Sequence, residues 1–215
     1  MVRRALVDLA FVGLYFCDDR TERLRSAEAD LSKALKRRPD SAAAHAGLGL
    51  LYLHKGRADR SVAECERALA IDPNFAAAHA WIGFAKHLAG RNDETEAHVL
   101  EALRISPRDI YAGNWMIIAA AAKLGAGRDE EAVVWYNRSI GLNPNRPITH
   151  FALAAALASL GREEDAREEV RAGLKLDPGF TILRYRSMTF GDHPVYLAGR
   201  ERICEGMRMA GVPEE

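Results

Sequence analysis

Seven histidines are the residues of this sequence best suited to metal binding or acid–base chemistry. His45, His79 and His150 occupy the same place in a helical pattern that repeats along the chain. Neighbouring packed helices lie about 10 Å apart, whereas zinc ligands converge to about 2 Å from one ion. The three histidines are therefore predicted to fill packing positions between helices. The remaining four show no metal-ligand spacing: His54, His87, His98 and His193.

Nucleophilic and phosphate-binding chemistry is equally poorly represented. No GxSxG string occurs, and Cys65 lies at an inward position where a buried thiol is unreactive. Gly125, Ala126 and Gly127 begin like a phosphate-binding loop but lack the preceding strand and the third glycine. We therefore predict no catalytic residue, no cofactor and no metal site. The chain is expected not to be an enzyme, although a longer parent protein with a catalytic domain upstream stays open.

The clusters of charged residues are also interpreted as structural rather than as catalytic or ligand-binding groups. The runs at 129–131 and 163–165 are acidic and begin predicted helices, where the helix dipole favours carboxylates. They are interpreted as solvated first-turn acids rather than paired catalytic groups. A basic group near the end is interpreted as a solvated face rather than an anion site: Arg184, Arg186, Arg200 and Arg202.

A repeated unit organises these residues. The stretch 42–73 is written again as 76–107, so that Gly49 matches Gly83 and Pro73 matches Pro107, each 34 residues apart. A fixed period of this length indicates a solenoid of stacked repeats.

The unit reads as a helical hairpin. Small residues such as Gly49 and Ala68 allow two helices to approach closely. Gly56 is predicted to end the first helix in a left-handed conformation, and Asp72 before Pro73 to end the second. Ser41 is predicted to cap the following helix.

The period and these residues resemble the tetratricopeptide repeat (TPR) family. The first copy supplies His45, Leu48, Gly49, Tyr52, Gly56, Ser61, Cys65, Ala68 and Pro73. The second supplies His79, Ile82, Gly83, Lys86, Gly90, Thr95, Val99, Ala102 and Pro107. Lys86 departs from the family's aromatic residue, which suggests a more open face there.

The resemblance implies an all-α, right-handed TPR superhelix, an α-solenoid of antiparallel helix hairpins with a C-terminal capping helix. A divergent repeat is expected over 1–39, with helices at 3–16 and 22–36. TPR repeats are expected over 40–178, divided as 40–73, 74–107, 108–144 and 145–178. The third is three residues longer, which an extended first helix would accommodate. Residues 179–215 are expected to form a partial repeat and the capping helix, with helices at 180–188 and 195–210.

In the TPR family the first helix of each repeat lines a concave groove that binds protein or peptide partners. Carried onto this sequence, that mapping gives the candidate partner-binding residues Ala46, Leu50, His54, Ala80, Phe84, His87, Met116, Lys123 and Phe151. The set is mostly apolar, which suits an amphipathic helix, a copy of the same protein or a flanking helix of the chain itself. The alternative is that the small residues only let the superhelix curl tightly.

The amino-acid composition limits the kinds of partner and the location expected for the chain. Lys and Arg total 30 and Asp and Glu total 30, so net charge gives no case for nucleic acid or an anionic membrane. Three scattered cysteines indicate reduced thiols, and a cytoplasmic location is predicted. The apolar stretch 5–16 is interrupted by Asp8 and is too short to span a bilayer, so it is interpreted as an amphipathic helix rather than a leader.

The C-terminal end carries a second resemblance. Asp177 to Phe180 (DPGF) and Gly206 to Glu215 (GMRMAGVPEE) are similar to the ends of TPR regions in bacterial class III adenylate/guanylate cyclases and related regulators. Two functions therefore stay open: a non-catalytic protein–protein interaction module, and the regulatory or oligomerising tail of a bacterial signalling enzyme such as an adenylate cyclase.

Overall fold

The computed structural model describes residues 1–13 and 19–215, and every regular element in these ranges is a helix. In chain order they are α1 (Val2–Gly13), α2 (Arg20–Arg37), α3 (Ala42–His54), α4 (Ala58–Ile71), α5 (Ala76–Leu88), α6 (Asn92–Ile105), α7 (Ala112–Gly125), α8 (Asp129–Leu142), α9 (Pro147–Ser159), α10 (Glu163–Leu176), α11 (Ile182–Ser187) and α12 (Pro194–Ala210). The expected all-α class is confirmed. In the same part of the chain, no helix combines the length and apolarity needed to cross a bilayer.

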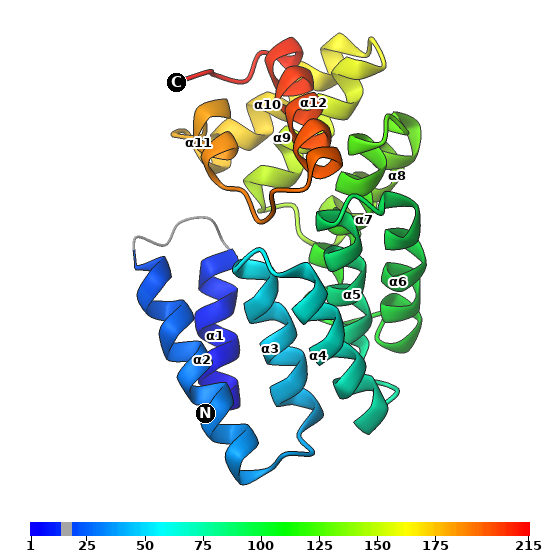
Figure 1. Cartoon of the computed structure of the whole chain (residues 1–215). Coiled ribbons are helices and arrows are strands. Elements are labelled where there is room, and N and C mark those ends of the chain that lie inside the picture. Colours follow the sequence, from blue (N-terminus) through cyan, green and yellow to red (C-terminus); the bar gives the residue numbers. More distant parts are fainter. Residues whose placement is uncertain (14–18) are drawn as a thin grey trace.

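Consecutive helices pair into five antiparallel hairpins, from α1–α2 to α9–α10, and the hairpins stack side by side (Figure 1). The first helices of successive hairpins also contact one another, from α1 through α3, α5 and α7 to α9. These first helices line the inner side of the stack, and the predicted solenoid is confirmed.

Glycine ends the first helix of four hairpins as the sequence predicts. Gly56 and Gly90 have φ of 67° and 73°, in the left-handed region that glycine adopts without a Cβ clash. The same conformation recurs one hairpin at a time, at Gly127 and Gly161. Ser41 caps α3, because its side chain accepts a hydrogen bond from the backbone N–H of Ala44. Single residues therefore determine where the helices of the repeat begin and end.

Close packing within each hairpin follows from the small residues. A Cβ added to Gly83 would lie 3.0 Å from the carbonyl oxygen of Thr95, and one added to Gly173 would lie 2.7 Å from the ring of Phe151. A larger residue at either position would push the two helices apart, which explains why these positions are small.

The longer third repeat accommodates its extra residues mostly in a loop. The connection before α7 runs over 106–111, whereas the equivalent connections cover 72–75 and 143–146. Helix α7 has 14 residues against 13 in α5 and α9. The expectation that an extended first helix absorbs the insertion is therefore correct for one residue and wrong for two. Asp109 stabilises this loop by accepting a hydrogen bond from the N–H of Tyr111 at 2.9 Å.

Two of the repeated histidines, His45 and His150, join the two helices of their own hairpin to each other and to the connection that precedes it. His150 Nδ1 lies 2.7 Å from Glu169 Oε2, and its Nε2 lies 2.8 Å from the carbonyl oxygen of Pro144. His45 makes the same pair of contacts, with Glu64 and Pro39. The packing role predicted for these two residues is confirmed, and the hydrogen bonds explain why a polar ring suits the position.

The N-terminal hairpin differs from the sequence expectation at its ends. Helix α1 is described as far as Gly13, so the predicted end at residue 16 lies outside the described residues. Helix α2 begins at Arg20, with Asp19 as the N-cap residue and no side-chain capping hydrogen bond. Arg4 holds this hairpin together, since its guanidinium lies 2.6 Å from the nearly buried carboxylate of Asp30.

The core divides unequally. One continuous cluster of buried apolar side chains runs from Ala76 in α5 to Val212 near the C-terminus. A separate, smaller cluster joins α1, α2 and α3, with Leu9, Leu31 and Leu51 at its centre. Two further small clusters join α3, α4 and α5, and join α3 and α5 to Phe190 and Tyr196. The largest core is therefore shared by the C-terminal two-thirds of the chain.

Candidate peptide-binding groove

The inner face of the solenoid is crossed by the chain's own C-terminal segment. We call residues 188–210 the strap; it comprises the loop 188–193 and helix α12. Helix α12 packs mainly on α9 and α7 and only slightly on α10 (Figure 1). The final helix therefore caps the solenoid by lying along its inner side as well as at its end.

Aromatic contacts fix the loop of the strap. The ring of Phe190 lies 5.6 Å from that of His54 and 5.8 Å from that of Phe84, centroid to centroid. The guanidinium of Arg20 lies 5.5 Å from the centre of the Phe190 ring, within the range of a cation–π interaction. Phe190 thus joins α2, α3 and α5, elements that lie more than 100 residues earlier in the sequence.

Helix α12 approaches the solenoid at backbone distance. A Cβ added to Gly199 would lie 3.0 Å from Gly125 Cα, and one added to Gly206 would lie 2.6 Å from the carbonyl oxygen of Ala155. Gly199 and Gly206 lie two turns apart on the same face of α12, and their lack of a side chain allows α12 to pack directly on α7 and α9. Gly199, Gly206 and Ala155 are all buried.

Two arginines of α12 secure the strap rather than facing solvent. Arg202 forms a bidentate ion pair with Asp129, with both N···O distances at 2.7 Å, and donates to the carbonyl oxygen of Leu124 at 2.9 Å. Arg200 is buried, donates to the carbonyl oxygen of Tyr185 at 2.6 Å, and lies 4.1 Å from the centre of the Tyr185 ring.

The predicted solvated basic face is therefore wrong for Arg200, which is buried, and for Arg202, which is paired with a buried carboxylate, whereas Arg186 is exposed as predicted. Arg184 pairs with Asp177 at 3.1 Å, and Arg186 pairs with Glu201 at 2.5 Å. Asp129, predicted as a solvated first-turn acid, is buried because α12 brings Arg202 onto it. The acids at 163–165 are exposed as predicted.

The strap covers several predicted groove residues. His54 and His87 are buried, and His87 packs edge-on against Tyr196 of α12 with ring centroids 5.2 Å apart. Phe84 is half-buried beneath Phe190. Burial lowers the pKa of His54 to about 3 and that of His87 to about 4, so both rings are neutral near pH 7. His87 also hydrogen-bonds the amide oxygen of Asn92 at 2.7 Å.

Lys123 is held inside the solenoid. Its ammonium lies 2.6 Å from Glu96 and 3.0 Å from Glu131, and its side chain is only 4% exposed. Glu96 also accepts a hydrogen bond from the indole N–H of Trp135 at 2.9 Å. This network ties α6, α7 and α8 together and places the charge of Lys123 between helices.

The other predicted groove residues divide between the core and the surface. Ala46, Ala80 and Met116 are buried in the core, as is Phe151, which stacks on Phe180 at 3.9 Å between ring centroids. Leu50, Trp81 and Phe84 are half-buried and pack against a buried cluster that includes Phe190 and Tyr196. The partly exposed part of the inner face is thus an apolar patch of Leu50, Trp81 and Phe84.

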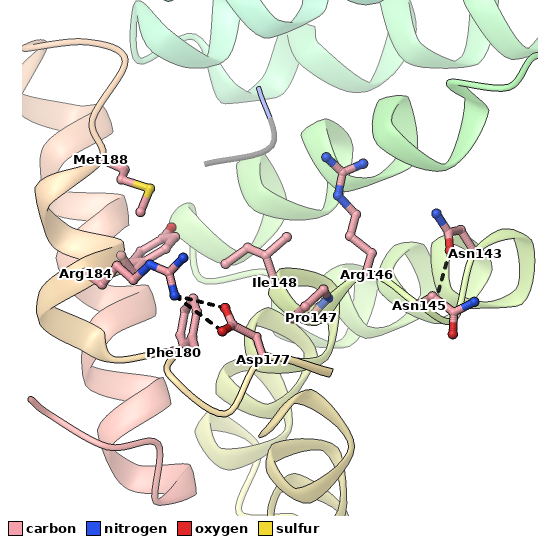
Figure 2. Close-up of a pocket in the computed structure, with 10 residues that line it drawn as sticks. Asn143, Asn145, Arg146, Pro147, Ile148, Asp177, Phe180, Arg184 and Met188 are labelled. Atoms are coloured by element: carbon pink, nitrogen blue, oxygen red, sulfur yellow. Dashed lines mark hydrogen bonds and ion pairs between the residues drawn. The ribbon is translucent and has the colours of Figure 1, made fainter. Parts of the chain in front are cut away.

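A pocket of about 270 Å³ lies between the start of α9, the start of the strap and α11 (Figure 2). Its apolar lining is Pro147, Ile148, Phe180, Tyr185 and Met188; its polar lining is Asn143, Asn145, Arg146, Asp177 and Arg184. The sequence draws attention to Arg184 in the basic group, to Asp177 and Phe180 in the C-terminal resemblance and to Ile148 on the inner face, but it predicts no pocket that brings them together. The Asn, Arg and Pro residues before α9 predict only the start of a helix. Their position next to α11 follows from the fold.

The chemistry of the remaining candidates is that of packing. Cys65 is fully buried, and burial raises the pKa of its thiol to about 12. The rings of His79 and His98 stack with centroids 6.3 Å apart. Among the residues that the structure describes, no three His, Cys, Asp or Glu side chains are grouped to hold a metal ion.

The sequence did not predict that the strap packs on the inner face of the solenoid. Phe190 and Tyr196 flank a Gly-Asp-His-Pro stretch that predicts only a loop. Two aromatic residues around such a loop are a signal for anchoring, but their targets, His54 and His87, lie in distant repeats.

Comparison with known proteins supports the repeat reading. Residues 19–75 match the family model of the tetratricopeptide repeat. The tetratricopeptide repeat and J domain-containing co-chaperone DNJ1 of Fusarium oxysporum f. sp. lycopersici is 35% identical over 65 residues. That match covers 30% of this chain and 12% of the co-chaperone.

Solved structures extend the similarity to most of the chain. PilF of Pseudomonas aeruginosa superposes with a TM-score of 0.68 at 21% identity, covering 85% of this chain and 82% of PilF. YrrB, a TPR protein with an unusual peptide-binding site, superposes with a TM-score of 0.57 at 20% identity, covering 84% of this chain and 90% of YrrB. The chain therefore has the fold of the tetratricopeptide repeat solenoids, and residues 19–75 carry the sequence pattern of that family.

Proposed function

We propose that this chain is a non-catalytic protein–protein interaction module that binds a peptide or helix on its inner face. The observation that carries the proposal is the half-buried patch of Leu50, Trp81 and Phe84, which remains partly exposed beside the strap. Apolar side chains gathered on a concave surface are typical of sites that accept another polypeptide. The peptide-binding site of YrrB, which shares the fold, adds support.

The strap narrows the proposed site. It occupies the side of the groove where the first helices end, at Gly56, Gly90 and Gly125. A partner would therefore lie along the opposite side, where the first helices begin, and would meet Ala43 and Ala77 at equivalent positions of α3 and α5. Both residues are half-buried.

A pair of charge insertions tests this placement. Peptides would be selected from a displayed library on the full chain, and their affinities remeasured with the double variant Ala43→Glu, Ala77→Glu. A glutamate in the first turn of a helix is compatible with the helix dipole, so the variant should fold, but its bulk and charge would block the groove. We expect affinity to fall at least about tenfold, or about 1.4 kcal/mol.

The chain offers a matched control for this test. Ala63 and Ala97 are also 34 residues apart and are exposed on α4 and α6, the second helices of the same hairpins. The variant Ala63→Glu, Ala97→Glu should keep the affinity of the wild type. Equal binding by the wild type and both double variants would contradict a partner site on the inner face.

We also propose a cytoplasmic location, because the three scattered cysteines indicate reduced thiols, and no membrane or nucleic-acid partner, because the formal net charge is zero. Self-association through the apolar patch is part of the same proposal, and sedimentation at several protein concentrations would test it.

The second candidate function is a regulatory or oligomerising tail of a bacterial signalling enzyme such as an adenylate cyclase. It is favoured by the resemblance of the C-terminal string, whose residues are ordered: Ile182 N–H donates to the carbonyl oxygen of Pro213 at 2.9 Å, and Val212 is buried. Reading the coding sequence upstream of Met1 tests it, since an in-frame stop codon immediately upstream would remove this candidate.

A further inference from the structure

Basic side chains gather at one end of the first hairpin. The start of α1 and the end of α2 lie side by side there, next to the connection to α3 (Figure 1). Residues 1–4 and 30–41 contain six basic side chains and two acidic ones, of Asp30 and Asp40. The six basic residues are exposed, and we call them the basic end: Arg3, Arg4, Lys33, Lys36, Arg37 and Arg38.

Most of this positive charge is not neutralised within the first hairpin. Arg4 hydrogen-bonds the carboxylate of Asp30, and this contact together with the charges of Arg4 and Lys33 lowers the pKa of Asp30. The other four side chains form no ion pair or hydrogen bond with any residue that the structure describes: Arg3, Lys36, Arg37 and Arg38. The charge balance of the basic end is therefore positive.

The helix dipoles account for only part of this cluster. Lys36 and Arg37 lie in the last turn of α2, where a cation is favourable. Arg3 lies in the first turn of α1, where the dipole disfavours a cation and where α1 has no acidic residue. A charge that opposes the local preference, with no ionic partner among the described residues, points to function rather than to stability.

The basic end continues the side of the groove on which the partner is proposed to lie. Arg3, Ala43 and Ala77 are each the second residue of a first helix, in α1, α3 and α5. Helix α1 packs on α3, and Ala43 follows Arg38 by five residues. In the described part of the chain no hairpin stacks beyond α1. A polypeptide that follows the starts of the first helices therefore meets these cations at the end of the groove.

We propose that the basic end binds an acidic stretch of the partner polypeptide, next to the segment that lies against Ala43 and Ala77. Several aspartate or glutamate residues of the partner would face Arg3 and the last turn of α2. The neighbouring inner face is apolar, which suits a polypeptide better than a phosphate backbone. Exposed charge pairs act mainly on specificity and on the rate of encounter. This inference rests on the proposed function, because it names the chemistry of the partner.

The test titrates the full chain, isotope-labelled for amide NMR, with a blocked acidic peptide, Gly-Glu-Asp-Glu-Asp-Gly. The matched probe is its uncharged analogue, Gly-Gln-Asn-Gln-Asn-Gly. We expect the acidic peptide to shift the amide signals of Arg3 and of residues 36–38, and the analogue to leave them in place. Because the contacts are ionic and exposed, the shifts should shrink as the salt concentration rises.

Two triple variants with the same change in net charge assign the effect. The first neutralises part of the basic end and should weaken the acidic peptide at least about fivefold: Lys36→Gln, Arg37→Gln, Arg38→Gln. The second neutralises exposed cations elsewhere and should leave the affinity unchanged: Arg57→Gln, Arg108→Gln, Lys175→Gln. Arg3→Gln alone should weaken the same peptide about twofold or more. Thermal unfolding followed by circular dichroism verifies that the variants fold.

Several results would overturn the inference. They are equal binding of the acidic and uncharged peptides, equal weakening by the two triple variants, and no amide shift at the basic end with millimolar acidic peptide. Tighter binding of a short single-stranded RNA, or of vesicles of phosphatidylserine and phosphatidylcholine, than of the acidic peptide at the same salt would assign these cations to a phosphate-bearing ligand. That result would also overturn it.

Selection from the displayed library separates this inference from the proposed function. Peptides selected on the wild type should carry acidic residues at one end, and this enrichment should disappear on the first triple variant. If the selected peptides are blocked by Ala43→Glu, Ala77→Glu but show no acidic enrichment, the interaction module stands and only this assignment of its partner falls.

Discussion

Single histidines show how position decides chemistry in this chain. His87 and His150 are both nearly buried, but His87 meets Tyr196 and neutral Asn92, whereas His150 meets the carboxylate of Glu169. Burial lowers the pKa of His87 to about 4, while the hydrogen bond that His150 donates to the carboxylate of Glu169 raises the pKa of His150 above its ordinary value. The two residues therefore make opposite contributions to the pH dependence of stability.

We expect His87 to destabilise the fold in acid. Its pKa is lower in the folded chain than the ordinary value of 6.5, so the unfolded state binds the proton first as pH falls. Between pH 6.5 and about 4, wild type should lose up to about 1.4 kcal/mol per pH unit relative to His87→Gln. Urea unfolding at several pH values measures the difference. Parallel curves for the two proteins would show that His87 is not buried as a neutral ring.

His150→Gln should give the opposite sign. Because the folded pKa of His150 is raised, its contribution is fully present below pH 6.5 and is lost as pH rises through the folded pKa. The variant should therefore be more strongly destabilised at pH 6 than at pH 8, by the same urea measurement. A larger loss at pH 8 would mean that the pair with Glu169 does not hold in solution.

Among the helices, α12 depends on close backbone contact with both α7 and α9. Replacing Gly206 by alanine puts a methyl group against the carbonyl oxygen of Ala155, where the spacing is 2.6 Å. We expect a loss of about 1–3 kcal/mol in unfolding free energy, as for other overpacked sites. Gly141→Ala in α8 is the control, since a Cβ there meets nothing within 4 Å and alanine favours the helix by about 0.5–1 kcal/mol. Equal changes in unfolding free energy for the two variants would contradict the close packing of α12 on α9.

The ion pair of Arg202 with Asp129 is a second interaction that holds α12 on the solenoid. Arg202→Gln leaves the buried carboxylate of Asp129 without its charged donor, and we expect a loss of about 1.5–3 kcal/mol. Arg171→Gln, which removes an exposed contact of 3.5 Å with Glu164, should cost less than about 0.5 kcal/mol. A double-mutant cycle with Asp129→Asn isolates the pair. Additive losses would show that the two groups do not interact.

The buried apolar side chains of the described residues form four clusters of unequal size. The cluster from α5 onward includes α12, which returns to pack on α7 and α9, whereas the cluster of α1, α2 and α3 lies at one end. In a stack whose hairpins contact mainly their neighbours, an end unit opens at lower free energy than the middle. Hydrogen exchange should therefore be faster in α2 than in α7 and α9.

Gly206→Ala provides the internal control for this exchange experiment. The change should speed exchange in α9 and α12, which share the altered contact, and leave α2 unchanged. Uniform acceleration along the chain would mean that the molecule unfolds as a single unit and that the two clusters are not independent.

The sequence by itself determined the hairpins, because the features that make them are local. Gly56 turns one helix into the next, Ser41 starts a helix, and Gly83 lets two helices touch; each works within a few turns of chain. Only the tertiary structure decided that residues 188–210 return across the inner face. That placement depends on the match of Phe190 to Phe84, of Arg202 to Asp129 and of Gly206 to Ala155, residues far apart in sequence that no periodic pattern connects. The pocket was undetermined for the same reason, since α9 and α11 form it together only after folding.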